Sequence, residues 1–236
     1  MAFTPKSTAR LPGGHQIPLL GLGVYQNYSA RTSVLQALEA GYRHVDSART
    51  YRNEEAVGQD VAQSNVKRED IFVTSKITGR NQGYQSALQS TKRLETYKAL
   101  LEARDEGKIR NVGVSNYGIH HLKEITEVEF EPPAVNQIQG KPLVHPFRQQ
   151  RETVDYCQKN GIIVQAYSPL IRVRKGMFDH LTITAIANKH GKDDAQKGYG
   201  PLVWATLPKS SDPKRIASNA AVSDFELDGG MADLDS

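Results

Sequence analysis

Three residue types that together form an acid–base device follow strand-like segments in the first third of the chain. Asp46 ends one such segment and Tyr51 follows five residues later, while Lys76 ends the next segment. A tyrosine phenol has an ordinary pKa near 10, and a neighbouring ammonium group favours the phenolate and lowers that pKa. Such a phenol can protonate a developing alkoxide near neutral pH, with the aspartate holding the lysine charged and oriented. From spacing alone, an ordinary Asp–Lys ion pair beside a surface tyrosine is the commoner arrangement.

Polar residues also end the later strand-like segments, where an α/β barrel would collect them, because its active site lies at the C-terminal ends of the strands. These residues are Ser115, Asn116, Gln137, Tyr167, Ser168, Lys209 and Ser210. Asp212 and Pro213 fit the N-cap and first turn of a short helix. Arg215 on that helix and Lys209 before it would suit a phosphate monoester. A solvated basic turn explains the same residues equally well.

Short segments rich in β-branched and apolar residues alternate with helical segments along the chain. The strand-like segments are 17–23, 43–48, 71–77, 111–116, 134–139, 162–170 and 202–210. Helical segments between them end at glycines suited to the position after a helix, namely Gly41, Gly107 and Gly161. The alternation predicts parallel strands joined by helical crossovers, and the number of repeats favours an α/β protein of the (β/α)8 TIM barrel type.

An open nucleotide-binding sheet is the alternative α/β architecture. It should begin with G-x-G-x-x-G between a strand and a helix, followed by an acidic partner for the ribose. The segment from Gly21 to Gln26 has its second glycine at Gly23 but lacks the third. The open sheet is therefore disfavoured.

Two stretches interrupt the barrel pattern. No apolar, β-like segment stands between Lys76 and the strand predicted at 111–116, so the fourth strand is predicted to be missing. Between Gly191 and the last predicted strand, the chain is too short and too rich in glycine for a full helix, so part of the seventh helix is predicted to be missing.

Composition indicates one globular domain over residues 1–236, because a barrel of about 250 residues needs nearly all of them. The net charge is +4, but the basic residues are scattered among 26 acidic ones, which disfavours nucleic acid as a partner. The lone Cys157 excludes an intramolecular disulfide and favours a reducing compartment. No leader or membrane span is recognisable, so a cytoplasmic protein is expected. No metal is expected, because no cluster of ligand residues has metal-binding spacing.

The remaining candidates are weaker. His44, on the same predicted strand as Asp46, is interpreted as a satisfied core or rim histidine. His120 and His121 open a predicted helix and are not expected to be catalytic. A basic run at 172–175 either approaches cofactor phosphates or is a solvated loop.

Several motifs together resemble the aldo-keto reductase family. GYRHVDSARTYRNEEAVG (41–58) resembles the family segment with the catalytic aspartate and tyrosine, and FVTSKI (72–77) resembles the one with the catalytic lysine. GKIRNVGVSNYG (107–118), AVNQI (134–138), AYSPL (166–170) and LPKSSDPKRIASN (207–219) resemble its cofactor-binding segments, in the same order. The resemblance spans most of residues 10–235 and implies a (β/α)8 barrel that reduces carbonyls with NADPH.

The resemblance also implies a role for each matching residue. Tyr51 would be the general acid, Lys76 would lower its pKa, and Asp46 would orient Lys76. The residues that would hold the nicotinamide end are Ser115, Asn116 and Gln137 on the carboxamide and Tyr167 stacked on the ring. Ser168 and Leu170 would lie along the pyrophosphate. The residues that would hold the adenosine end are Lys209, Ser210, Arg215 and Asn219. The first three of them would favour NADPH over NADH.

The chain also departs from the family pattern. Members carry a fourth strand with a histidine that completes the catalytic tetrad, whereas no histidine occurs here between His44 and His120. The chain ends before the loop that usually helps to form the substrate pocket, so internal deletions and a truncated C-terminus are expected. The expected protein is a monomer or weak dimer that reduces small aldehydes, ketones or sugars with NADPH, in an impaired form. An inactive nucleotide-binding barrel and a non-functional truncated isoform remain the alternatives.

Overall fold

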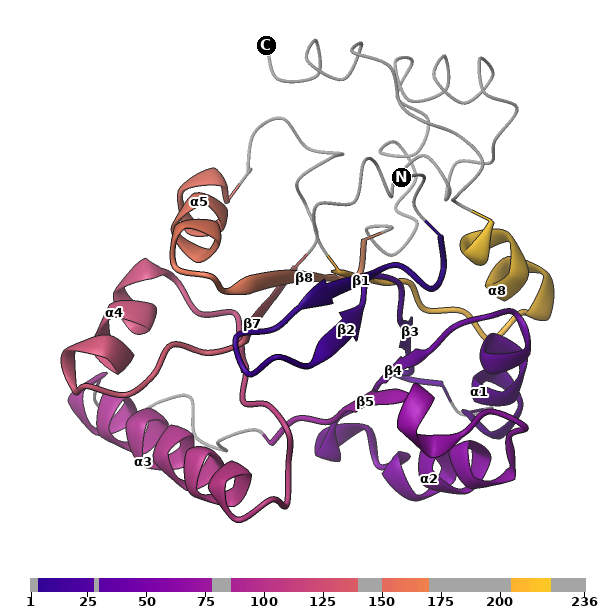
Figure 1. Cartoon of the computed structure of the whole chain (residues 1–236), viewed down its shortest axis with the longest axis horizontal. Coiled ribbons are helices and arrows are strands. Elements are labelled where there is room, and N and C mark those ends of the chain that lie inside the picture. The colour runs from indigo at the N-terminus through magenta and orange to yellow at the C-terminus, as the bar shows by residue number, and fades with distance from the viewer. Residues whose placement is uncertain (1–3, 28–29, 78–85, 140–149, 170–204, 222–236) are drawn as a thin grey trace, which may run out of the picture.

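The computed structural model describes residues 4–27, 30–77, 86–139, 150–169 and 205–221, apart from the side chains of 30–31 and 86–91. Parallel strands lie inside a layer of helices (Figure 1). One sheet contains β3 (Leu22–Gly23), β4 (His44–Asp46) and β5 (Phe72–Thr74). The other contains β6 (Val114–Ser115), β7 (Val135–Gln139), β8 (Ile163–Tyr167) and β9 (Ala205–Leu207). This arrangement confirms the α/β barrel predicted from the alternating segments.

The two sheets join through β3 and β9. Leu20 and Thr206 form a parallel bridge, the Gly21 N–H donates to the Thr206 carbonyl over 2.9 Å, and the Gly23 N–H donates to the Pro208 carbonyl over 2.9 Å. A side chain at position 21 would come within 2.8 Å of His44 and Leu207, so only glycine allows the strands to approach so closely. The wall therefore runs without a break in the order β5-β4-β3-β9-β8-β7-β6.

No described strand stands between β5 and β6. Within the described residues, the chain passes from β5 to α3 (Ser86–Asp105) and then to β6 without another strand, which agrees with the predicted loss of the barrel strand that would follow β5. Residues 78–85 lie outside the described residues, so this loss stays a prediction. The predicted shortening of the seventh helix concerns residues 170–204, which lie outside the described residues.

Helices cover the outside of both sheets. α1 (Ala30–Glu39), α2 (Glu54–Gln63) and α8 (Pro213–Ala220) lie beside β3 and β4, whereas α3, α4 (Ile119–Glu127) and α5 (Arg151–Lys159) lie on the side of β6 to β8 (Figure 1). One apolar core joins α1, α2 and α8 to β4, and another joins α4 and α5 to β7 and β8. α3 packs on α4 through a third cluster that includes Tyr97, Leu101 and Ile125.

A β-hairpin closes the end of the barrel opposite the polar strand ends. β1 (Thr8–Arg10) pairs antiparallel with β2 (Gln16–Pro18), and Leu11 and Ile17 pack against residues at the start of β7 and β8. The single strand predicted at 17–23 was therefore wrong in its extent. Ile17 belongs to this hairpin, and only residues from Leu20 onward join the barrel wall, because the chain changes pairing partners at Leu19.

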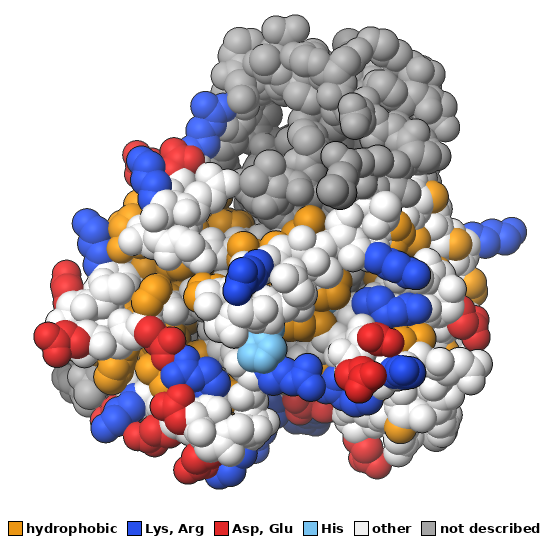
Figure 2. All heavy atoms as spheres, viewed as in Figure 1, with side chains coloured by type: hydrophobic (Ala, Val, Ile, Leu, Met, Phe, Trp, Pro, Cys, Tyr) orange, Lys and Arg blue, Asp and Glu red, His pale blue; other side chains and the backbone are white. Residues whose placement is uncertain are grey.

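The surface of the described residues mixes both signs of charge. Figure 2 shows Lys and Arg side chains next to Asp and Glu side chains across one face of the molecule, with no single-sign patch. No helix in the described part of the chain is long and apolar enough to cross a membrane.

Candidate active site

The strand ends bring the predicted polar residues together at one end of the barrel. Asp46 is the last residue of β4 and is level with Gly23 of β3 and Thr74 of β5. In the second sheet, Ser115 of β6 is level with Gln137 of β7, which is level in turn with Gln165 of β8. Parallel register therefore gathers side chains from segments that are distant in the sequence.

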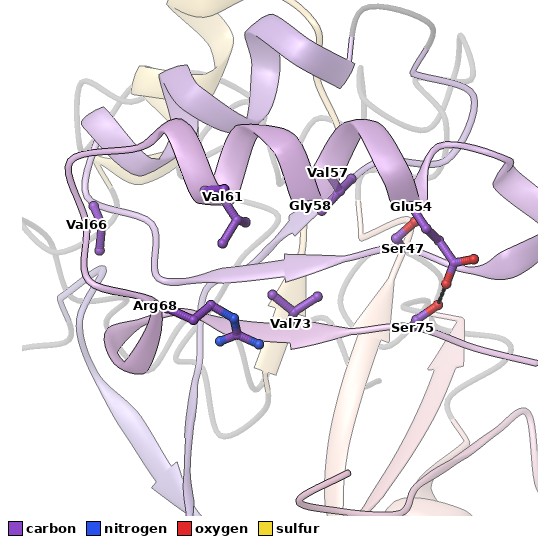
Figure 3. A pocket seen from close by; sticks show the side chains of 10 residues that line it. Ser47, Glu54, Val57, Gly58, Val61, Val66, Arg68, Val73 and Ser75 are labelled. Atoms are coloured by element: carbon purple, nitrogen blue, oxygen red, sulfur yellow. Dashed lines mark hydrogen bonds between the residues drawn. The ribbon is translucent and has the colours of Figure 1, made fainter. Parts of the chain in front are cut away.

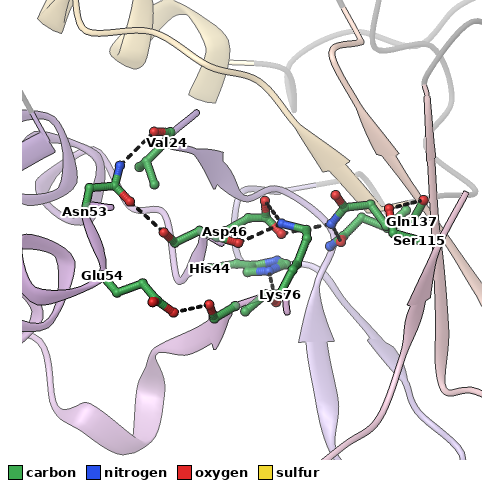
Figure 4. Close-up of polar contacts among 12 residues, drawn as sticks. Val24, His44, Asp46, Asn53, Glu54, Lys76, Ser115 and Gln137 are labelled. Atoms are coloured by element: carbon green, nitrogen blue, oxygen red, sulfur yellow. Dashed lines mark hydrogen bonds and ion pairs between the residues drawn. The ribbon is translucent and has the colours of Figure 1, made fainter. Parts of the chain in front are cut away.

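Asp46 and Lys76 form a short ion pair inside the barrel mouth (Figure 4). Lys76 Nζ lies 2.5 Å from Asp46 Oδ1 and also donates to the Ser47 carbonyl over 2.8 Å. The side chains are only 17% and 5% exposed, so water screens the pair weakly. Removing either partner would leave the other charge buried and uncompensated.

Tyr51 lies beside this ion pair. It ends the 3₁₀ helix η1 (Arg49–Tyr51), and Lys76 Nζ lies 5.6 Å from the centroid of its ring. Tyr25 packs edge-on against the same ring, with centroids 5.0 Å apart. Arg52 ends η1 with a left-handed φ of 55°, a conformation that side chains seldom adopt and that persists where the surroundings impose it.

Polar contacts join the residues before and after η1, including the bond from Asn53 to Val24 (Figure 4). Ser47 Oγ donates to Asn53 Oδ1 over 2.7 Å, and Asn53 Nδ2 donates to the Val24 carbonyl over 2.9 Å. The Val24 N–H donates to the Asp46 carbonyl over 3.1 Å. These bonds tie the start of α2 to the ends of β3 and β4, on both sides of η1.

The expected lowering of the Tyr51 pKa was wrong for the protein alone. Burial, followed by the negative charge of Asp46 and the neighbouring Tyr25, raises the pKa of the Tyr51 phenol to about 12. The physical reason is that the folded protein buries the phenol, and the carboxylate of Asp46, which pairs with Lys76, adds to the rise. Tyr51 is therefore protonated throughout the neutral range.

Gln137 makes a contact that the sequence did not predict. Its Nε2 donates to Asp46 Oδ2 over 2.9 Å and to Gln165 Oε1 over 2.5 Å. The first bond connects the two sheets across the barrel interior (Figure 4). Both carboxylate oxygens of Asp46 therefore have a donor, one from Lys76 and one from Gln137.

The other residues expected at the nicotinamide lie next to Gln137. Ser115 Oγ donates to the Gln137 carbonyl over 3.0 Å, and the Asn116 N–H donates to the same carbonyl over 2.8 Å. Tyr167, which ends β8, donates from its hydroxyl to Asn116 Oδ1 over 3.2 Å. Asn116 and Ser168 both have positive φ, 59° and 49°, so the backbone turns sharply at both strand ends.

The basic segment after β9 folds as predicted. Asp212 is the N-cap of α8, accepting from the Lys214 N–H over 2.8 Å and the Arg215 N–H over 3.2 Å, and Pro213 opens the helix. Within the described residues, neither Lys209 nor Arg215 forms an ion pair, and both are exposed. Ser210 and Asn219 are buried.

His44 is a core residue, as predicted. It is fully buried, with Nδ1 3.3 Å from the Pro18 carbonyl oxygen and Nε2 3.0 Å from Thr74 Oγ1. His120 and His121 lie in the first turn of α4, and none of the described hydrogen bonds or ring contacts joins either of them to Asp46, Tyr51 or Lys76. Leu170 and the basic run at 172–175 lie outside the described residues. Among the described side chains, no group of His, Cys, Asp or Glu could hold a metal ion, and the expected absence of a metal stays a prediction.

A separate hollow lies outside the barrel wall, between α2 and β5 (Figure 3). Its volume is about 390 Å³, and Val57 and Val61 of α2 face Val73 of β5 across it. Neither Tyr51 nor Lys76 lines it, so it is distinct from the site at the strand ends.

Gln165 is the main polar residue of the site that sequence reasoning missed. It is 1% exposed, stands in the middle of β8, and accepts the bond from Gln137. The available signal was a long amide inside the otherwise apolar segment 162–166, which is unusual for a buried strand.

The geometry agrees with comparisons to known proteins. The sequence model of the Aldo/keto reductase family matches residues 12–94 and 87–182. A glyoxal reductase of Bacillus subtilis is 37% identical over 259 residues, which cover 96% of this chain and 91% of the relative. An aldo-keto reductase from a Medee basin deep-sea metagenome library has a TM-score of 0.86 at 34% identity, covering 96% of this chain and 93% of the other. A Bombyx mori aldo-keto reductase solved in complex with NADP has a TM-score of 0.83 at 30% identity, covering 99% and 93%.

The same comparisons locate what this chain lacks. The span aligned with the glyoxal reductase, 259 residues, exceeds the whole chain of 236, so the relative has internal residues without a counterpart here. The family match falls into two pieces that overlap at 87–94, between β5 and β6, where the described residues hold no strand. This chain belongs to the aldo/keto reductase family of oxidoreductases and has the family's α/β barrel fold, and its described residues contain no strand between β5 and β6.

Proposed function

We propose that this chain binds NADPH and reduces small aldehydes, with Tyr51 as the proton donor. The observation that carries the proposal is the contact set at the strand ends, in which a buried Asp46–Lys76 ion pair lies against the ring of a protonated tyrosine. Hydrogen-bonding side chains from three further strands stand at the same end of the barrel. This combination provides a proton, a nearby positive charge and a binding surface.

The bound nicotinamide would supply the hydride that converts the carbonyl carbon into an alcohol carbon. The Tyr51 hydroxyl would give its proton to the carbonyl oxygen, leaving a phenolate. A phenol with a pKa of about 12 still protonates an alkoxide, which is a much stronger base. The Lys76 ammonium group then stabilises the phenolate as it forms, which is where its charge contributes most. Asp46 would keep Lys76 in position throughout.

The side chains present fit a nicotinamide. Ser115, Asn116 and Gln137 offer hydrogen-bonding groups on adjacent strand ends, and the half-buried Tyr167 beside Asn116 offers a ring for stacking. Within the described residues, no hydrogen bond reaches Gln137 Oε1, so an acceptor remains for a ligand. Ser168 follows at the turn after β8, where the pyrophosphate would pass.

The preference for NADPH over NADH is proposed from the segment after β9. Lys209 and Arg215 are exposed cations without ion pairs among the described residues, and both stand close in sequence to the N-cap of α8. They would hold the extra phosphate of NADPH, with Ser210 and Asn219 at the adenosine. The Bombyx mori relative was solved with NADP, which supports the same cofactor here.

Small reactive aldehydes, dicarbonyls included, are the proposed substrates, because a relative that aligns with 96% of the chain is a glyoxal reductase. We also propose that turnover is impaired. In the family pattern, a further barrel strand between β5 and β6 carries a catalytic histidine, and no such strand is present among the described residues. A barrel that binds the nucleotide without turnover is the second candidate, favoured by that same gap. Residues 1–236 would form one domain.

A steady-state assay with one matched control tests the reaction. NADPH consumption is followed with glyoxal and with glyceraldehyde, in the unchanged protein, Tyr51→Phe and Tyr156→Phe. Tyr51→Phe should lower turnover by about 10²–10⁴ while the melting temperature is kept, because only the proton donor is lost. Tyr156→Phe removes a hydroxyl on α5 and should match the unchanged protein. Equal rates in all three proteins would reject Tyr51 as the donor.

Calorimetry tests the cofactor. Lys209→Ala with Arg215→Ala should weaken NADPH binding and leave NADH binding unchanged, because only the extra phosphate loses its partners. Lys123→Ala removes an exposed charge from α4 and serves as the control. An equal Kd for both nucleotides in the unchanged protein would reject the proposed preference.

A further inference from the structure

Gln165 is a buried amide whose role is not explained by stability. It is 1% exposed in the middle of β8, level with Gln137 of β7. Its Oε1 accepts from Gln137 Nε2 over 2.5 Å, but its own Nε2 is buried and has no hydrogen-bond partner within the described residues. A buried donor without a partner destabilises the folded state, so an apolar residue would suit this position better for packing alone.

Asp46 fixes which group donates and which accepts in the hydrogen bonds that link Asp46, Gln137 and Gln165. An ionised carboxylate can only accept, so the group that Gln137 turns toward Asp46 must be its NH2 group. That nitrogen lies 2.9 Å from Asp46 Oδ2, and its second N–H is directed to Gln165. Gln165 must therefore turn its oxygen toward Gln137, because a second NH2 group at 2.5 Å would be repelled.

This arrangement leaves one group of Gln137 available. Both of its N–H groups are used, and within the described residues its Oε1 has no partner. If Gln165 offered no acceptor, Asp46 would be the only group holding the amide, through a single N–H, and the amide plane could turn about that bond. The oxygen of Gln137 would then no longer be held in one direction.

We propose that Gln165 is a positioning residue that fixes the amide of Gln137, so that Gln137 holds Asp46 through its nitrogen and presents its oxygen as an acceptor for the NH2 group of the nicotinamide carboxamide. The inference rests on the proposed use of a nicotinamide cofactor. Gln165 itself touches neither cofactor nor substrate. It acts through Gln137, which is in contact with Asp46.

A cofactor analogue tests this directly. The 3-acetylpyridine analogue of NADP⁺ has a methyl group where the carboxamide has its NH2 group, so it cannot donate to Gln137 Oε1. Calorimetry should show that the unchanged protein binds NADP⁺ about tenfold more tightly than the analogue, the size of one net hydrogen bond. In Gln165→Met the preference should fall to about one, through weaker binding of NADP⁺.

Gln165→Glu is the matched rescue. In either protonation state it keeps an oxygen facing Gln137, so the preference for NADP⁺ should persist. Gln165→Leu is a second apolar variant in case the methionine variant folds poorly. Each apolar variant removes the unpaired donor of Gln165 but leaves one N–H of Gln137 without its acceptor, so both should melt close to the unchanged protein.

The outcomes separate the two proposals. A wild-type protein that binds neither NADP⁺ nor the analogue rejects the proposed function. A wild-type protein that binds both equally, or an apolar variant with its preference intact, rejects the role of Gln165 and leaves the function standing. Loss of the preference in Gln165→Glu as well as in Gln165→Met also rejects it, because the acceptor would then not be the relevant group.

Discussion

The carboxylate of Asp46 is almost completely buried, and two neighbouring side chains stabilise its negative charge there. Lys76 supplies a full positive charge at one oxygen and Gln137 supplies a neutral N–H at the other. Charge-assisted bonds of this kind stabilise a carboxylate that burial alone would neutralise. Burial is the main cause of the high pKa of Tyr51, and the carboxylate that holds Lys76 adds to it.

Because His44 is buried, we expect the protein to lose measurable stability at acid pH. Burial lowers its pKa to about 4, partly offset by Asp46, whereas an unfolded histidine has a pKa near 6.5. As the pH falls below 6.5 the unfolded chain takes up a proton that the folded protein does not accept until about pH 4. The unfolding free energy should therefore decrease by up to about 3 kcal/mol across this window. Urea unfolding at pH 7, 6 and 5 measures it.

Two variants isolate this effect from the titration of carboxylates. His44→Gln should show a shallower decline of the unfolding free energy between pH 6.5 and 5 than the unchanged protein. His15→Gln, at an exposed position with a bond to Asn111, should keep the steeper decline. Identical pH profiles in the unchanged protein and His44→Gln would falsify the assignment.

At the level of the elements, helix and strand ends carry both the fold and the site. α1 and α5 are followed, two residues after their last helical residue, by Gly41 and Gly161, whose φ values of 96° and 69° suit residues without a side chain. Each leads directly into the strand that follows, β4 or β8, and so sets where the polar end of that strand lies. The chemistry depends on these junctions, because a shift of one residue along a strand would turn Asp46 or Gln137 away from the interior.

The N-cap residue of α8, Asp212, should contribute to stability independently of the active site. Asp212→Ala removes the acceptor for the Lys214 and Arg215 N–H groups and should lower the unfolding free energy by about 1 kcal/mol. Ser211→Ala, one residue earlier and also exposed, should change it little. Chemical denaturation of both variants checks this, and equal midpoints would show that the cap contributes nothing measurable.

At the scale of the whole molecule, β5 and β6 are the two ends of the described wall, and each has a strand partner on one side only. The backbone groups on their other sides have no strand partner among the described residues, unlike those of a closed barrel. The part of the wall from β5 through β9 to β6 remains continuous. The strand ends assigned to the cofactor belong to that continuous part.

Binding and turnover should therefore respond differently to repair of the wall. Inserting the fourth strand of a complete family member, with its histidine, between β5 and α3 should raise turnover by about 10²–10³, because the histidine donates to the developing oxyanion. The Kd for NADPH should change much less. The control insert carries alanine in place of that histidine and should repair stability without raising turnover. Ordinary turnover of about 1–10³ s⁻¹ in the unchanged chain would contradict the proposed impairment.

The sequence by itself determined the class of fold and the helix boundaries near glycine and Asp212, because these follow from local patterns of apolar residues and backbone preferences. It also predicted that no strand stands between Lys76 and α3, in agreement with the described residues. It also singled out Asp46, Tyr51 and Lys76, which the structure brings together, although their roles stay a prediction. Only the tertiary structure decided how deeply each ionisable side chain is buried and which groups lie beside it. The rise in the Tyr51 pKa depends on burial in the folded protein, and the bond from Gln137 to Asp46 joins strands of different sheets. Both depend on packing between segments distant in sequence, which no local pattern encodes.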